Sequence, residues 1–148
     1  MRVMKSLKRM HYLCITALVC SLPGNLGAAG DNRIAVELPA MMQQHMLSNM
    51  RDHLAAINDI LGFLASDQLE EAAEAAEYRL GMSSLQSHGA SHMARFMPEG
   101  MRQIGTSMHQ AASRFALKAQ EGDAAAAYRA LTDITSACVT CHSGYRIK

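Results

Sequence analysis

Five consecutive residues near the end of the chain combine two thiols and an imidazole at a spacing that suits one kind of chemistry. They are Cys138, Val139, Thr140, Cys141 and His142, a C-x-x-C-H pattern. On a helix, steps of three and four residues place both cysteines and the histidine on one face. Two thiols there can add to the two vinyl groups of a porphyrin, and the histidine can reach the iron. The pattern is typical of c-type haem attachment. It predicts one haem c bound covalently through Cys138 and Cys141, with His142 as an axial ligand.

The beginning of the chain is typical of a secretory signal peptide. A cationic segment (residues 2–9) precedes an apolar core (12–22), and small residues follow at 27–29. A helix as long as this apolar core rises only about 16 Å, too little for a bilayer core of roughly 30 Å. We therefore expect residues 1–29 to be a cleaved signal peptide and residues 30–148 to be the mature domain. This implies a periplasmic location without stable membrane insertion after cleavage.

Cleavage would change both the charge and the cysteine content. Four basic residues and no acidic ones would leave, so the formal net charge of +1 would become about −3. Cys14 and Cys20 would leave as well, and only Cys138 and Cys141 would remain. A mildly acidic chain without a basic cluster gives no support to nucleic-acid binding.

Three other kinds of site could use the residues of the C-x-x-C-H pattern. A thioredoxin-like dithiol lies at a helix N-terminus beside a βαβ pattern, but here the sequence shows almost no strand signal. A structural zinc site needs four ligands, and only two cysteines would survive export. A plain disulfide leaves His142 unexplained and closes a very short loop. Haem attachment is therefore the preferred interpretation.

The rest of the chain is rich in good helix formers and poor in aromatic residues. Apolar residues at three- and four-residue steps predict four helices. Their ranges are about 38–65, 69–80, 98–122 and 124–145. Asp67 with Glu70 resembles a capping box, and Asp123 is the expected N-cap of the last helix. The expected buried residues of the first and third helices are Met42, Met46, Met50, His53, Ile57, Ile60, Leu61, Leu64, Met101, Ile104, Met108, Ala112 and Phe115. These elements predict an all-α, antiparallel four-helix bundle; the alternative is a helical hairpin that dimerises.

A second protein ligand to the iron would decide between two functions. A six-coordinate His/Met haem suits electron transfer, whereas a five-coordinate haem can bind NO or CO. In an antiparallel bundle the first helix begins beside the end of the last, so we expect Met46, central to the apolar stripe, to be the distal ligand. Met50 lies nearby, His45 lies at the stripe's edge, and His53 lies about 10 Å further along. A methionine on such a stripe is often core filler, so open coordination and His45 remain alternatives.

The C-terminal C-x-x-C-H followed by Tyr145-Arg146, on an all-α chain with a signal peptide, resembles the cytochrome c′ superfamily of class II c-type cytochromes. The resemblance covers the mature chain by architecture but only its C-terminal residues by motif. It implies a periplasmic haem protein that shuttles electrons or binds small gases, often as a dimer. It also implies that Arg146 lies beside the haem; the alternative is a solvated cation near the end of the helix. The low-spin members place a methionine in a segment similar to residues 46–51.

Two further histidines lie four residues apart, His88 and His92, and could bind copper with Met93 and Met97 if their segment were helical. Gly89 argues against a helix there, so a loop or interface role is expected. His109 is expected at the surface or rim of the third helix. The sequence therefore predicts a periplasmic monohaem cytochrome that transfers electrons to redox partner proteins and converts no substrate itself. Alternatives are a gas-binding haem protein and a helical metallochaperone without haem.

Overall fold

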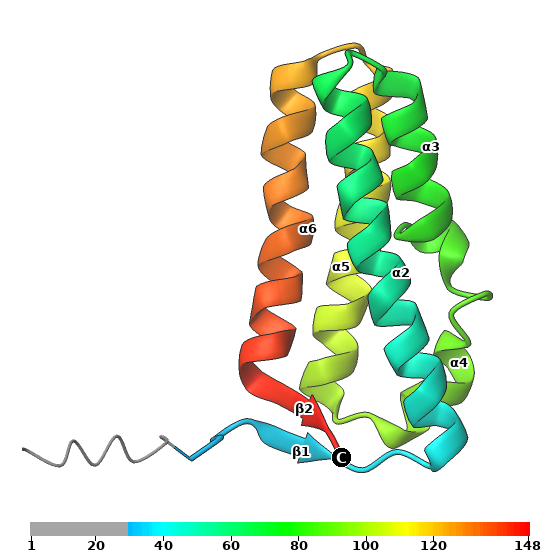
Figure 1. The fold of residues 1–148 in the computed structure, drawn as a ribbon, viewed down its shortest axis with the longest axis vertical. Coiled ribbons are helices and arrows are strands. Elements are labelled where there is room, and N and C mark those ends of the chain that lie inside the picture. Colours follow the sequence, from blue (N-terminus) through cyan, green and yellow to red (C-terminus); the bar gives the residue numbers. More distant parts are fainter. Residues whose placement is uncertain (1–29) are drawn as a thin grey trace, which may run out of the picture. The chain divides into compact units, whose positions relative to one another are not determined.

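The structure is a computed structural model and describes residues 30–148. Helices make up most of this part of the chain (Figure 1). The expected signal peptide lies outside the described residues. The chain divides into two units, residues 1–31 and residues 32–148, and the helices and strands belong to the second. The expectation of an all-α fold is confirmed. Within residues 30–148 no helix has both the length and the apolar character needed to cross a membrane.

Four long helices account for most of the described residues. They are α2 (Ala40–Ala65), α3 (Leu69–Arg79), α5 (Glu99–Gln120) and α6 (Ala124–Gly144). Between α3 and α5 lie the 3₁₀ turn η1 (Met82–Ser84), the short α4 (Ala90–Met93) and the 3₁₀ turn η2 (Ala94–Phe96). Two short strands, β1 (Ile34–Val36) and β2 (Tyr145–Ile147), precede α2 and follow α6.

The helix ends follow local chemistry, with one correction. Asp123 caps α6 as expected, because its Oδ1 accepts a hydrogen bond from the backbone N–H of Ala126 at 2.9 Å. The expected capping box before α3 is wrong: the residue at the N-cap is Gln68, without a side-chain hydrogen bond. Asp67 instead has a φ of 57°. An Asp tolerates this left-handed conformation, and it serves to turn the chain between α2 and α3.

The two strands form a parallel pair that the sequence did not predict. Ile34 lies opposite Tyr145, and Val36 lies opposite Ile147. Pro39 explains why the chain stays extended before α2, because the residue preceding a proline is biased away from helix. The pairing ties the entry of α2 to the exit of α6, which is the end of the molecule that carries the C-x-x-C-H residues (Figure 1).

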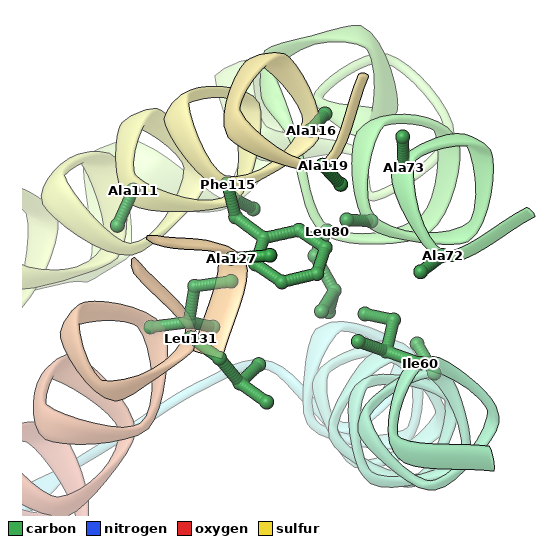
Figure 2. Close-up of a cluster of buried hydrophobic side chains, with 14 of the residues drawn as sticks. Ile60, Ala72, Ala73, Leu80, Ala111, Phe115, Ala116, Ala119, Ala127 and Leu131 are labelled. Atoms are coloured by element: carbon green, nitrogen blue, oxygen red, sulfur yellow. The ribbon is translucent and has the colours of Figure 1, made fainter. Parts of the chain in front are cut away.

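The core is divided into two clusters. In the larger one, the fully buried ring of Phe115 is surrounded by side chains from all four long helices, including Ile60, Ala73 and Ala127 (Figure 2). Many of its other members are alanines, whose small side chains let helices approach closely. Of the stripe expected on α2, Met46, Ile60 and Leu64 are buried, but Leu61 is 46% exposed.

The smaller cluster lies where the strands meet the helices. Its buried members are Val36, Leu38, Met46, Met93 and Met101, and Cys141 packs against them. The closely packed pairs of long helices within residues 32–148 are α5–α6, α3–α5 and α2–α3. The pair α2–α6 is not among them. Side chains from these two helices instead line a cavity.

Candidate functional site

A cavity of about 790 Å³ is lined by side chains of α2, α5 and α6 and of the segment between α3 and α5. Its volume lies in the range of cofactor and ligand sites. Most of its wall is apolar. Side chains from near both ends of the described residues therefore line one cavity.

All three residues of the predicted haem motif line this cavity. Cys138 and Cys141 are half-buried on the last turns of α6, and His142 is exposed beside them. Cys138 packs against the larger cluster and Cys141 against the smaller one. The helix therefore presents two thiols and an imidazole to the same space, which is the arrangement that the spacing predicted.

The electrostatic surroundings of the two thiols do not favour thiolates. Burial raises the pKa of Cys138 and of Cys141 above the ordinary value. Both also lie near the C-terminal end of α6, where the helix dipole disfavours negative charge. Dithiol oxidoreductases rely on a lowered thiol pKa at a helix N-terminus, so the site lacks the features of that class.

The placement of α2 determines which of the expected distal-ligand candidates reach the cavity. Met46 is 6% exposed and lines the cavity, as do the half-buried Met50 and His53. Met41 is 73% exposed and is not part of the wall. His45 is also absent from the wall. Its Nε2 lies 3.0 Å from the carbonyl oxygen of His88.

Sequence reasoning missed Met93 and Met97 as cavity residues; they come from the segment 87–97, to which no structure could be assigned. On α5, Met101 and Met108 line the cavity, and both are buried as expected. The only sequence signal for Met93 and Met97 was their proximity to the unassigned histidines. The cavity is therefore lined by six thioethers, of which Met46 is one.

Three arginines also line the mostly apolar cavity: Arg33, Arg102 and Arg146. Arg146 is half-buried in β2, opposite Ala35, and lines the cavity. Its expected position beside a haem stays a prediction. Arg33 donates a hydrogen bond through Nη1 to the carbonyl oxygen of His142 at 3.3 Å. Arg102 does the same to the carbonyl oxygen of Ala94 at 3.4 Å. A molecule held here would thus meet both apolar surface and positive charge.

Three histidine rings lie together on the cavity wall. The ring centroids of His53 and His88 are 4.8 Å apart, those of His88 and His109 are 5.5 Å apart, and those of His53 and His109 are 6.0 Å apart. The expectation that His109 lies at the surface is wrong, because it is only 9% exposed. Its Nδ1 donates to the carbonyl oxygen of Leu80 at 2.6 Å. The polar group is satisfied, which permits its burial.

The three rings are held neutral by their surroundings. Burial, with the neighbouring His88 and His109, lowers the pKa of His53 to about 4. Burial also lowers the pKa of His88 and of His109. At neutral pH all three are uncharged imidazoles.

The alternative in which His88 and His92 bind one metal ion is not supported by their placement. Gly89 has a φ of 62° and interrupts the helix between them, so His88 is buried while His92 is exposed. The carbonyl oxygen of His88 accepts hydrogen bonds from His45 and, at 3.0 Å, from Nδ2 of Asn49. His88 is thus directed towards α2 and the other two rings.

The comparisons add no relative: no family model, no curated protein and no solved structure matches the chain. The likeness to class II cytochromes consequently depends on the motif and on the order of the helices. The function has to be argued from the residues of the cavity.

Proposed function

We propose that the protein is a periplasmic monohaem c-type cytochrome that transfers electrons. In this proposal haem c is bound covalently through Cys138 and Cys141, with His142 as the proximal ligand. The observation that carries the proposal is that the C-x-x-C-H residues of α6 and Met46 of α2 line one cavity. These residues come from opposite ends of the mature chain, so the fold brings the expected ligands together.

The chemistry of the wall fits this cofactor. A porphyrin is a large, mostly apolar plane that carries two carboxylates, and the cavity combines apolar side chains with Arg33, Arg102 and Arg146. Guanidinium groups recognise carboxylates well. The apolar wall favours burial of the macrocycle, because removing apolar surface from water is the main driving force for such binding.

Met46 is the proposed distal ligand. It is buried, it lines the cavity, and it belongs to the cluster against which Cys141 packs. Methionine with histidine is an axial pair found in electron-transferring cytochromes c, where it raises the redox potential. When bound, such a haem supplies an iron that gains and loses one electron, and the protein itself converts no substrate.

The proposed architecture is an antiparallel four-helix bundle of α2, α3, α5 and α6, in keeping with the resemblance to cytochromes c′. We propose redox proteins as partners and a homodimer as the assembly. Support for a homodimer comes from three exposed leucines at seven-residue steps on α2, namely Leu47, Leu54 and Leu61, which are 41%, 72% and 46% exposed. Residues seven apart share one face of a helix.

The test is maturation of the full chain in a host with cytochrome c assembly machinery. The expected product is coloured, has the mass of the processed chain plus one haem, and gives a low-spin spectrum after reduction. A colourless product with the mass of the bare processed polypeptide would overturn the proposal. A high-spin spectrum that changes on addition of CO would replace electron transfer by gas binding and remove Met46 as a ligand.

A further inference from the structure

We propose that His53, His88 and His109 form a binding site for one copper(I) ion on the wall of the cavity. The three residues come from α2, from the turn before α4 and from α5, so only the tertiary structure brings them together. This site goes beyond the proposed function and does not depend on the haem.

The separations between the rings match those of imidazoles that share one ion. With metal–nitrogen distances of about 2.0 Å, the centroids of such rings lie roughly 5 to 5.5 Å apart and their nitrogens about 3.4 Å apart. Here the centroids are 4.8 to 6.0 Å apart, and Nε2 of His53 lies 3.5 Å from Nδ1 of His88. A good hydrogen bond between two ring nitrogens would be shorter, at about 3 Å.

The hydrogen bonds around the rings leave nitrogens available for an ion. Nδ1 of His109 donates to the carbonyl oxygen of Leu80 at 2.6 Å, which leaves its Nε2 with a lone pair. A backbone carbonyl in this position is the usual partner of a metal-bound histidine, since it fixes the tautomer. Nδ1 of His88 lies 3.2 Å from Oγ of Ser84, so binding through Nδ1 moves the ring hydrogen of His88 to Nε2.

One adjustment is required. Within residues 30–148 no three His, Cys, Asp or Glu side chains share a metal position as they stand. The side chains must therefore rotate to bring their three nitrogens to one point. His53 and His88 are already at nearly the required separation, so the main change is a closer approach of the rings of His109 and His53, whose centroids are 6.0 Å apart.

The charge of the site and its neighbours favours copper(I) over a divalent ion. Three neutral imidazoles supply no negative charge. The carboxylate of Asp52 acts on His53 and His88, but it is paired with Arg79 at 2.7 Å. Burying a dication in mostly apolar surroundings costs more than burying a monovalent ion. Met50 and Met108 line the same cavity. Imidazole suits copper and zinc alike, but thioether sulfur selects copper(I).

The experiment is an anaerobic titration of the purified, processed protein with Cu⁺ in competition with a coloured Cu⁺ chelator. We expect one Cu⁺ per chain, and a loss of affinity of at least about 100-fold in His53→Gln and in His109→Gln. Glutamine keeps a hydrogen-bond donor at each position. The matched control is His92→Gln, which removes an exposed histidine of the same region and should bind Cu⁺ like the wild type.

Four results would overturn the site. They are the absence of one-equivalent binding, undiminished affinity in both ligand variants, loss of binding in His92→Gln, and a preference for Zn²⁺ over Cu⁺. A measurement on the unaltered protein guards against variants that fail to fold. On addition of one equivalent of Cu⁺ to the reduced protein, the ring nitrogen NMR signals of His53, His88 and His109 should shift. Shifts confined to other histidines would contradict the proposal.

The titration separates this site from the haem. A colourless protein that binds one Cu⁺ through the three histidines would overturn the proposed function and support the copper site. A coloured protein that does not bind Cu⁺ would support the proposed function and overturn the copper site.

Discussion

Met46 combines three properties at the scale of the single residue: it is buried, it lines the cavity, and it packs in the cluster that Cys141 adjoins. Met41, on the same helix, has none of them. Other methionines and His53 also line the cavity. A test of the proposed distal ligand must therefore distinguish Met46 from these side chains.

In the proposed cytochrome, replacing Met46 with alanine should convert the haem from low-spin to high-spin and abolish the sulfur-to-iron charge-transfer band of the oxidised protein. Removal of a buried methionine should also cost about 2 to 5 kcal/mol of stability. Optical spectra of the matured variant check the first effect, with Met41→Ala as the control that retains the wild-type spectrum. An unchanged spectrum in the Met46 variant would assign the role to another wall residue.

Glu77 gives a pH-dependent contribution to stability. Burial raises the pKa of its carboxyl group, but hydrogen bonds from Ser113 and Ser83 outweigh this, so the pKa lies below the ordinary 4.5. The folded state therefore favours the carboxylate, and the stabilisation is fully present above pH 4.5 and lost as the pH falls through the lowered pKa.

We accordingly expect Glu77→Gln to be less stable than the wild type by about 1 kcal/mol at pH 7. The difference should disappear well below pH 4.5, where the native carboxyl group is protonated. Urea unfolding at the two pH values measures it. A difference that persists unchanged in acid would show that the charge of Glu77 is not responsible.

At the scale of the elements, the turn between η1 and α4 determines where His88 lies. Gly89 adopts a φ of 62°, and a Cβ added there would lie 3.0 Å from Nε2 of His45. Left-handed backbone is costly for residues other than glycine. The absence of a side chain at Gly89 therefore allows the carbonyl oxygen of His88 to meet α2, which places the ring beside His53.

Gly89→Ala should lower the free energy of unfolding by about 1 to 2 kcal/mol, through backbone strain and the close approach to His45. Gly62 is the matched control, because it lies on the exposed face of α2 and a Cβ there meets nothing within 4 Å. Gly62→Ala should raise stability by about 0.5 to 1 kcal/mol. Thermal unfolding compares the two, and equal shifts would contradict the account of the turn.

At the scale of the whole molecule, the segment before α2 and the segment after α6 are held together by the β1–β2 pair and by the smaller cluster. The cavity lies beside this junction. Of the exposed leucines of α2, Leu47 and Leu54 also line the cavity, whereas Leu61 does not. An exposed row of leucines is unfavourable in water unless another surface covers it.

If α2 forms the homodimer face, Leu61→Glu should convert the dimer to a monomer, because a buried carboxylate without a partner is strongly disfavoured. Leu61 does not line the cavity, so the haem spectrum should stay the same. Sedimentation or light scattering gives the mass, with Leu117→Glu on α5 as the control, since Leu117 is 61% exposed outside this row. A wild-type protein that is already monomeric would contradict the homodimer.

Local patterns determined much of this protein. The spacing of apolar residues predicted the four long helices to within a few residues at each end, and Asp123 was identified as a cap because an N-cap hydrogen bond spans only three residues. The C-x-x-C-H face followed from helical geometry. Such features depend on neighbours in the chain, so the sequence alone sufficed for them.

Other features depended on residues distant in sequence. The parallel pairing of β1 with β2, the burial of His109 and the meeting of His53, His88 and His109 all require contacts between separate elements. Helical periodicity tells which residues share a face but not what that face meets. The cavity between α2 and α6 was decided by tertiary packing, because its wall is assembled from segments that local sequence does not relate to one another.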